Sequence, residues 1–372
     1  MPAFALYRLP YRQECRLMAQ TDGEPEEITS VFALSGKSGF VMAPFAPDRR
    51  HPVLVLCPDW CDDLQPDSLL AEEGGLPDNI KDLLKEVLKR SRQKVSFRVG
   101  TRAHYAIDFA NFHSHIMEGE FTKIVLARCA REPNDGRLSP LQLFVKACRE
   151  YPRLFVALVS ARRCGTWLMA TPEVLLDGDG NGWSTMSLAG TMTLSDQQLS
   201  FDVPPTQGRH DEKNLKWSVK NIEEQRFVST FITESLEQVA TDIEEKGPYT
   251  MRAGNLVHLR SDFSFAMPDK ERVGELLHLL YPTPAVCGLP KEEARDFIVH
   301  NEFAPRLYYS GFAGPFDIEG ATHLFVALRC MRIDADCYNL YAGGGLLADS
   351  EEEAEWRETE DKMETMRHLI ND

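Results

Sequence analysis

Four short apolar segments between residues 154 and 191 constrain the fold of this chain most strongly. Only a few residues separate each segment from the next, and in order they read LFVALVSA, GTWLMAT, EVLLDGD and GWSTMSLAGT. Connections of this length suit tight turns, whereas parallel strands need a long crossover. The sequence therefore predicts four strands that pair antiparallel.

The segments around these strands add helices on both sides. Apolar side chains at helical spacing predict helices over residues 105–120, 140–152 and 215–243. Runs of β-branched and aromatic residues predict further strands over residues 122–132, 308–317, 321–333 and 337–347. This mixture favours an α+β fold, in which helices pack around large antiparallel β-sheets within a single large domain.

The first ninety or so residues carry sparser signals. Short apolar runs predict strands over residues 31–34, 39–45 and 51–57. After a loop rich in Pro, Gly and acidic residues, an amphipathic pattern predicts a helix over residues 80–94.

Composition limits the partners of the chain. Its 57 acidic residues outnumber 41 basic ones and give a net charge of −16, which argues against nucleic-acid or membrane partners. Charges interrupt what would be the apolar part of a signal peptide, and no stretch approaches membrane-spanning length. Nine scattered cysteines fit reduced thiols better than a disulfide framework. We therefore expect a soluble, cytoplasmic protein.

The last helix directs charge toward its buried side. Met363, Met366, Leu369 and Ile370 recur at helical spacing, and the same face continues backwards through Lys362, Glu358 and Glu355. Buried charges must be paired, metal-bound or used in chemistry. Ser350 and Glu353 predict a capping box at the start of this helix.

Three consecutive glycines, Gly343 to Gly345, precede the last helix and are expected to follow a strand. Their backbone N–H groups could approach an anionic ligand closely, or the glycines could simply form a turn between the strand and the helix.

A second inward carboxylate is predicted on the helix over residues 215–243. Glu224 follows Lys220 by four residues and lies on the side that is marked as buried by Trp217, Val228, Phe231 and Ile232. Its neighbours Glu223 and Gln225 are expected to point elsewhere. Two carboxylates on facing helices would suit Mg²⁺, although two separate salt bridges would explain them equally well.

Three more residues suggest chemistry at strand ends. Lys123 begins an apolar strand and could serve as a base if it is desolvated. Glu173 stands between two apolar strands and could remain protonated. Arg329 ends the segment LFVALR, where its guanidinium could bind a carboxylate. Ordinary structural roles remain open for all three residues.

Nine segments in order resemble the chorismate-utilising enzymes, and most closely the isochorismate synthases. From about Tyr105 to the end of the chain they read FTKIVLAR, ATPEVLL, SLAGT, KNIEEQRFV, YPTPAVCGLP, GFAGPF, FVALRC, YAGGGLL and EWRETEDK. The resemblance implies a chorismate-binding catalytic core over residues 97–372. Residues 1–96 would form the variable N-terminal part of the same domain.

The resemblance also implies roles for the candidate residues. Lys123 would be the general base for a water that attacks ring carbon two of chorismate, and Glu173 would be the general acid for the hydroxyl that leaves carbon four. Mg²⁺ would be held by Glu224 and Glu358, with Glu355 contributing through water. Residues around the substrate would be Gly190, Thr191, His258, Arg329, Ala342, Gly343, Gly345 and Lys362.

Four positions depart from the pattern of the family. Gln225 and Tyr281 stand where a histidine is common, Asn221 where an aspartate is common, and Gly344 where an alanine is common. None of them removes a residue to which the resemblance assigns a role in catalysis or metal binding.

Alternatives within and outside this family remain. By comparison with the relatives that the chain resembles, Lys123 together with Ala189 favours water over ammonia, so no glutaminase subunit is expected. A monomer or a weak homodimer is expected separately. Salicylate synthase, which goes on to eliminate pyruvate, is the alternative function. A component of anthranilate or aminodeoxychorismate synthase is less favoured, as is a silent chorismate-binding protein. The pathway that uses the product, for menaquinone, a siderophore or salicylate, stays open.

Overall fold

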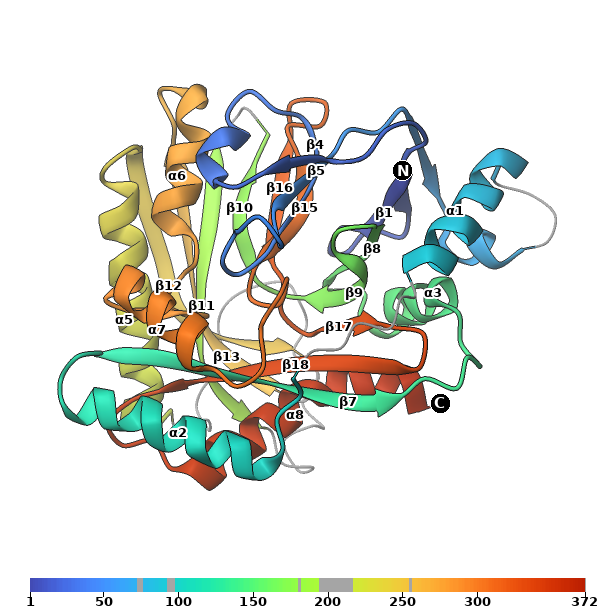
Figure 1. Cartoon of the computed structure of the whole chain (residues 1–372). Helices are drawn as coiled ribbons and strands as arrows, with labels where there is room; N and C mark the ends of the chain where they lie inside the picture. The colour runs from blue at the N-terminus through green and yellow to red at the C-terminus, as the bar shows by residue number, and fades with distance from the viewer. Residues whose placement is uncertain (72–75, 92–97, 180–181, 194–216, 254–255, 372) are drawn as a thin grey trace.

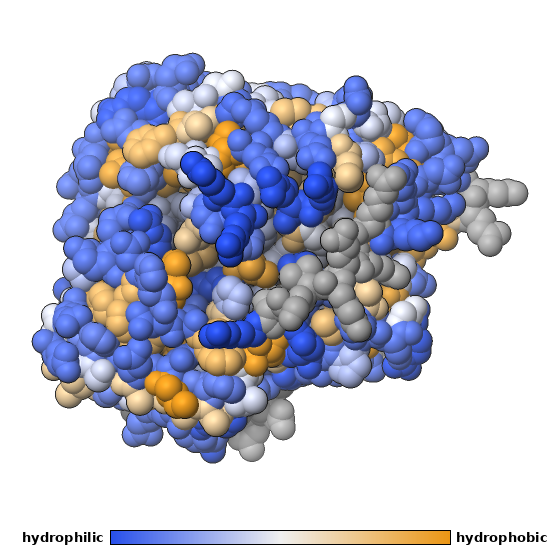
Figure 2. Space-filling view, viewed as in Figure 1, coloured by the Kyte–Doolittle hydropathy of each residue, from blue (hydrophilic) through white to orange (hydrophobic). Residues whose placement is uncertain are grey.

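The computed structural model describes residues 1–71, 76–91, 98–179, 182–193, 217–253 and 256–371. These residues form two antiparallel sheets of nine strands each, with helices packed around them (Figure 1). The face seen in Figure 1 is largely hydrophilic and carries only small scattered groups of apolar residues (Figure 2). The predicted α+β class with large antiparallel sheets is confirmed.

The first sheet carries the C-terminal strands at its centre. Its spatial order is β14 (Gly288–Leu289), β7 (Lys123–Pro133), β18 (Cys337–Leu346), β17 (Cys330–Ile333), β9 (Gly165–Thr171), β8 (Phe155–Ala161), β1 (Ala3–Arg8), β2 (Cys15–Gln20) and β6 (Trp60–Leu64). Its outer face packs on α1 (Asp78–Ser91), α3 (Pro140–Glu150) and α8 (Glu352–Asn371). Two further helices, α2 (Arg102–Met117) and α7 (Lys291–Asn301), cover the β7 end.

The second sheet lies against the inner face of the first. Its order is β12 (Thr241–Ala253), β13 (Leu256–Ala266), β11 (Trp183–Thr193), β10 (Val174–Gly178), β16 (Thr322–Val326), β15 (Phe312–Phe316), β4 (Gly39–Ala43), β5 (Val53–Leu56) and β3 (Glu26–Ile28). Its outer face packs on α5 (Val219–Leu236) and α6 (Val273–Leu280).

Strand periodicity explains how the core between the sheets forms. In β1, Ala3, Ala5 and Tyr7 face the second sheet, whereas Phe4 and Leu6 face the outer helices. Both sets are buried, so the alternation is between two apolar environments, and the sequence shows a continuous apolar run.

Two predicted strand arrangements are wrong, for the same reason. The strands β9 and β10 do not pair, because the chain leaves the first sheet after Thr171 and enters the second at Val174. The predicted strand over residues 321–333 is likewise two strands, β16 and β17, one in each sheet. Each crossing places a polar residue, Glu173 or Arg329, between the sheets.

The N-terminal residues complete both sheets. The predicted strands over residues 39–45 and 51–57 are confirmed as β4 and β5, and the helix predicted from Ile80 is α1, although residues 92–94 lie outside the described residues. Residues 31–34 are instead a 3-10 helix, because the Ser30 hydroxyl caps its first turn and buried Val31 and Leu34 face α6. The strands β1, β2 and β6 were not predicted.

The helix predicted over residues 215–243 is shorter than expected. The Ser218 hydroxyl accepts a hydrogen bond from the Asn221 N–H and caps α5 there, so Trp217 precedes the helix. From Thr241 the chain forms the β12–β13 hairpin, which was not predicted, nor were α6 and α7. None of the described helices is both long and apolar enough to cross a membrane.

Candidate active site

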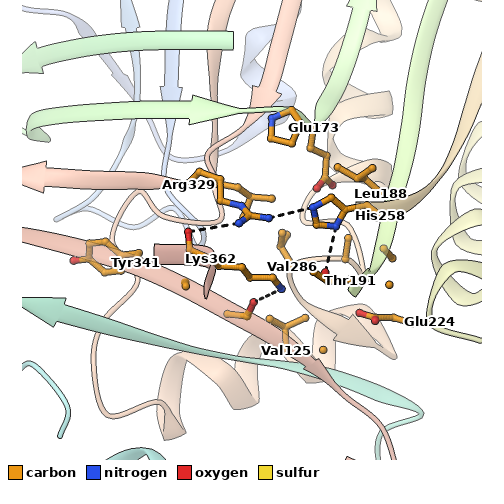
Figure 3. Close-up of a pocket in the computed structure, with 18 of the residues that line it drawn as sticks. Val125, Glu173, Leu188, Thr191, Glu224, His258, Val286, Arg329, Tyr341 and Lys362 are labelled. Atoms are coloured by element: carbon orange, nitrogen blue, oxygen red, sulfur yellow. Dashed lines mark hydrogen bonds between the residues drawn. The ribbon is translucent and has the colours of Figure 1, made fainter. Parts of the chain in front are cut away.

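A pocket opens where the two sheets meet, beside α5 and α8 (Figure 3). The empty space within it, counted together with the open solvent at its mouth, is about 630 Å³. Ten of the predicted site residues line it: Glu173, Gly190, Thr191, Glu224, His258, Arg329, Ala342, Gly343, Gly345 and Lys362.

Lys123 and Glu224 form an ion pair at one end of the pocket. The alternation of β7 places Lys123 on the same inward face as Val125, which lines the pocket. Lys123 is fully buried, and its Nζ lies 2.8 Å from Oε1 of Glu224. Burial acts to raise the pKa of Glu224, but Lys123, followed by Lys362 and Lys220, holds this pKa below its usual value. Glu224 is therefore a carboxylate.

Glu173 lies in the opposite electrostatic situation. It follows Pro172 at the crossing between the sheets and is 2% exposed. Burial raises the pKa of Glu173 to about 8, even though Lys123, Lys362 and Arg329 act to lower it. At neutral pH this side chain is a protonated carboxyl group in the pocket, as a general acid must be.

Two cationic groups, Arg329 and Lys362, lie beneath Glu173 in the pocket, with His258 facing Arg329 (Figure 3). Nη2 of Arg329 lies 3.2 Å from Nε2 of His258, and the other guanidinium nitrogen faces the backbone oxygen of Lys362. Nζ of Lys362 donates to the Gly343 carbonyl and pairs with Glu358 at 2.6 Å. Arg329 adopts a φ of 46°, which side chains rarely allow, and such strain is typical of functional sites.

The glycines of the site lie close to neighbouring groups. Gly190 has a φ of +68° at a bulge in β11, and a Cβ there would lie 2.9 Å from the Asn221 carbonyl oxygen. The three glycines Gly343 to Gly345 lie within β18 and not after it, paired with β7. A Cβ on Gly344 would lie 2.8 Å from Oε2 of Glu355, and one on Gly345 would collide with Glu224.

Three carboxylates thus converge on the β18 glycines from two helices. Glu224 comes from α5, and Glu355 and Glu358 come from α8. Glu355 is 2% exposed, and its Oε1 accepts hydrogen bonds from Lys220 and Ser350, whereas its buried Oε2 has no hydrogen-bond partner among the described residues. The predicted capping box is wrong, because the Ser350 hydroxyl binds Glu355 and the Leu347 N–H instead.

These carboxylates fit a divalent cation by their chemistry. Oxygen donors on two helices, one with an unsatisfied buried atom, match the preference of Mg²⁺. Each carboxylate is paired with a lysine: Lys123, Lys220 or Lys362. Within the described ranges, the only three His, Cys, Asp or Glu donors that all lie within 4.8 Å of one another are His115, Glu118 and Glu120, which are partly or fully exposed at the end of α2.

Sequence reasoning missed several residues of the site. The sequence analysis used Lys220 only to place Glu224 on one face of the helix, yet the Lys220 side chain donates a hydrogen bond to Glu355. The apolar and aromatic wall was not predicted, and it consists of Val125, Pro172, Leu188, Ala285, Val286, Tyr309, Leu328 and Tyr341. All of these residues except Tyr309 lie within the quoted motifs, and this position was the signal that could have identified them. The expectation that Gln225 points away is wrong, because Gln225 is 1% exposed and makes hydrogen bonds to β11.

Comparison with known proteins places this architecture in a class. The structure resembles the putative 2,3-dihydroxybenzoate-specific isochorismate synthase DhbC of Bacillus anthracis with a TM-score of 0.77 at 22% identity, covering 99% of this chain and 96% of that one. It also resembles MenF, the menaquinone-specific isochorismate synthase of Escherichia coli, with a TM-score of 0.73 at 20% identity, covering 99% and 89%. The two proteins share this fold.

Sequence comparison gives the family. The family described as chorismate binding enzyme matches residues 74–371, so the chain belongs to it. Isochorismate synthase EntC of Escherichia coli K12 is 28% identical over 67% of this chain and 62% of its own length. The salicylate biosynthesis isochorismate synthase of Pseudomonas aeruginosa is 32% identical over 69% and 52%. The chain thus spans about half to two-thirds of these relatives.

Proposed function

We propose that the protein is a Mg²⁺-dependent isochorismate synthase that converts chorismate to isochorismate. The observation that carries this proposal is a pocket lined by a protonated buried carboxyl group, Glu173, and by Glu224, which forms an ion pair with the fully buried lysine Lys123. Isomerisation by exchange of hydroxyl groups needs one group of each kind. The isochorismate synthases among the relatives support this choice.

The proposed reaction adds one water and removes another. Lys123 in its amine form takes a proton from water, whose oxygen forms a bond to ring carbon two of chorismate. Both ring double bonds shift, the bond from carbon four to its hydroxyl breaks, and Glu173 supplies the proton with which this hydroxyl leaves as water. Atoms balance, since the product is an isomer of the substrate. General acid–base assistance of this kind contributes roughly 10²- to 10⁴-fold.

The substrate carries two carboxylates, while the protein has a net charge of −16, so local positive charge must bind it. Arg329 offers a planar guanidinium for the enolpyruvyl carboxylate, and Lys362 lies beside it. Glu224 and Glu358, with Glu355 through water, would hold Mg²⁺, which would neutralise the ring carboxylate when bound.

Product analysis tests this function. The purified protein is incubated with chorismate and Mg²⁺, with and without ammonium, and the products are separated by chromatography. Isochorismate in both conditions is the expected result. Salicylate with pyruvate would instead identify a salicylate synthase, anthranilate formed only with ammonium would identify an ammonia-using enzyme, and no conversion would identify a silent binder.

A further inference from the structure

The face of α5 that packs on β11 is unusually polar. Asn221, Gln225 and Ser229 recur every four residues on this face. The Asn221 side chain donates to the Thr191 carbonyl at 3.4 Å, and the Ser229 hydroxyl lies 3.0 Å from the Ser187 hydroxyl. A helix normally covers a sheet with apolar side chains, so these contacts need a reason beyond burial.

Gln225 is the centre of this polar face. Its Oε1 accepts a hydrogen bond from the Ala189 N–H at 3.0 Å. Its Nε2 donates to the hydroxyls of Ser187 at 2.6 Å and Ser261 at 3.4 Å. A buried carboxamide without partners costs free energy, whereas one that is bonded at both ends has a fixed orientation. Gln225 therefore ties α5 to the segment of β11 that lines the pocket.

The backbone that Gln225 binds is irregular. β11 pairs with β13 in regular register up to Ala189, and the register then shifts at Gly190. Such a bulge leaves a residue outside the ladder and redirects the strand. Gln225 binds the N–H of Ala189, the residue before Gly190, and Asn221 binds the carbonyl of Thr191, the residue after it. The helix α5 therefore contacts both sides of the bulge.

The bulge in turn holds His258. The Thr191 hydroxyl lies 3.2 Å from Nδ1 of His258, and Nε2 of the ring faces Arg329 (Figure 3). A guanidinium can only donate, so Nε2 accepts and the ring hydrogen is on Nδ1. Burial, together with Arg329 and Lys362, lowers the pKa of His258 well below its usual value, so the ring is neutral. One series of hydrogen bonds thus runs from α5 to Arg329.

We propose that Gln225 is a positioning residue for substrate binding. It fixes the bulge at Gly190, and the bulge orients the His258 ring, which holds the Arg329 guanidinium in the pocket. This inference rests on the proposed function in assigning Arg329 to a substrate carboxylate. Gln225 touches neither Lys123 nor Glu173 in any described hydrogen bond, so it should affect binding more than the chemical step.

Kinetics of Gln225→Leu test the proposal, with Gln225→His as the conservative variant and Gln238→Leu, just beyond α5, as the matched control. In Gln225→Leu, we expect KM for chorismate to rise about tenfold, the loss typical of a hydrogen bond to a charged group, with kcat changed less than about threefold. Gln225→His retains one acceptor and one donor, so its KM should stay near that of the wild type. A KM in Gln225→Leu equal to that of Gln238→Leu would overturn the proposal.

A second measurement needs no substrate. Nitrogen NMR of the imidazole of His258, assigned with His258→Gln, should show a hydrogen on Nδ1 and an acceptor at Nε2 in the wild type. Gln225→Leu should lose this single pattern, while Gln238→Leu keeps it. Unchanged His258 signals in Gln225→Leu would contradict the proposal even if the protein is less stable. If the wild type does not convert chorismate, the proposed function fails, and the NMR result alone decides on Gln225.

Discussion

At the scale of single residues, a buried lysine and a protonated buried carboxyl group lie at the candidate site. Lys123 is fully buried beside a carboxylate, and Glu173 is buried without an ion-pair partner among the described residues and stays protonated. The raised pKa of Glu173 fits the proposed role of acid, whereas the proposed role of Lys123 as base follows from its burial and from the resemblance of motifs.

Replacement of Lys123 should separate binding from chemistry. Lys123→Ala removes the proposed base, so we expect kcat to fall at least about a hundredfold, the lower limit of general base catalysis. Arg329 and Lys362 remain, so the dissociation constant for chorismate, measured by calorimetry, should change little. The exposed Lys85→Ala on α1 is the control. Undiminished turnover in Lys123→Ala would remove Lys123 from the mechanism.

Glu173 should make both activity and stability depend on pH. The general acid must be protonated, so kcat should fall as pH rises through about 8. The folded-state pKa of about 8 exceeds the ordinary value of 4.5, so the folded chain binds more protons between these values, and stability should decrease as pH rises through them.

The variant Glu173→Gln, which cannot titrate at this position, tests the predicted pH dependence. This variant should lose turnover, and its free energy of unfolding should fall less between pH 6 and 8 than that of the wild type, as measured by urea denaturation. Parallel pH dependence in the two proteins would show that Glu173 does not titrate as described.

At the scale of elements, two helices bring three carboxylates to one strand. Glu224 from α5 and Glu355 and Glu358 from α8 meet at the β18 glycines. Helical spacing on α8 predicted this inward charge correctly, because i+3 and i+4 steps fix a face. The same reasoning failed for Gln225, because hydrogen bonds to Ser187 and Ala189 allow a polar side chain to be buried where periodicity favours an apolar one.

Glu358→Gln tests the metal assignment. Loss of one anionic ligand should raise the Mg²⁺ concentration for half-maximal activity about tenfold or more. Glu364→Gln, on the exposed side of the same helix, is the control. Thermal unfolding of the substrate-free protein gives an independent readout, since a ligand that binds the folded state raises the midpoint. The same Mg²⁺ titration in both variants would exclude Glu358 as a ligand.

At the scale of the whole molecule, the chain alternates between two sheets. The strands β7, β8, β9, β10, β11 and β18 were predictable, because they follow from apolar runs and turns, whereas β1, β2, β6, β12 and β13 were not predicted. The assignment of strands to sheets was not predictable, since residues 171–174 and 327–329 look like ordinary turns or continuous strand. Local sequence does not encode with which distant strand a strand will pair. Glu173 and Arg329 lie in these two segments, where the chain crosses from one sheet to the other.

The pocket was predictable only in part, because the local sequence does not show which distant strands come together around it. Lys123, Glu173 and Glu224 could be proposed from their position in apolar segments, and the resemblance of motifs assigned their roles. Tyr309 and Tyr341 were missed, because an aromatic residue in a buried segment is indistinguishable from core until the sheets are placed. The connection from Gln225 through Gly190 and His258 to Arg329 links α5, β11, β13 and the crossing after β16. It could be recognised only once the structure had placed these segments together.

The most direct test of the account follows the nucleophile. Unlabelled chorismate is converted by the protein with Mg²⁺ in water enriched in oxygen-18, and the product is analysed by mass spectrometry with fragmentation. Water attack activated by Lys123 predicts isochorismate that carries one labelled oxygen, in the hydroxyl on carbon two. Isochorismate without the label would show that the original hydroxyl is retained, which would contradict the proposed roles of both Lys123 and Glu173.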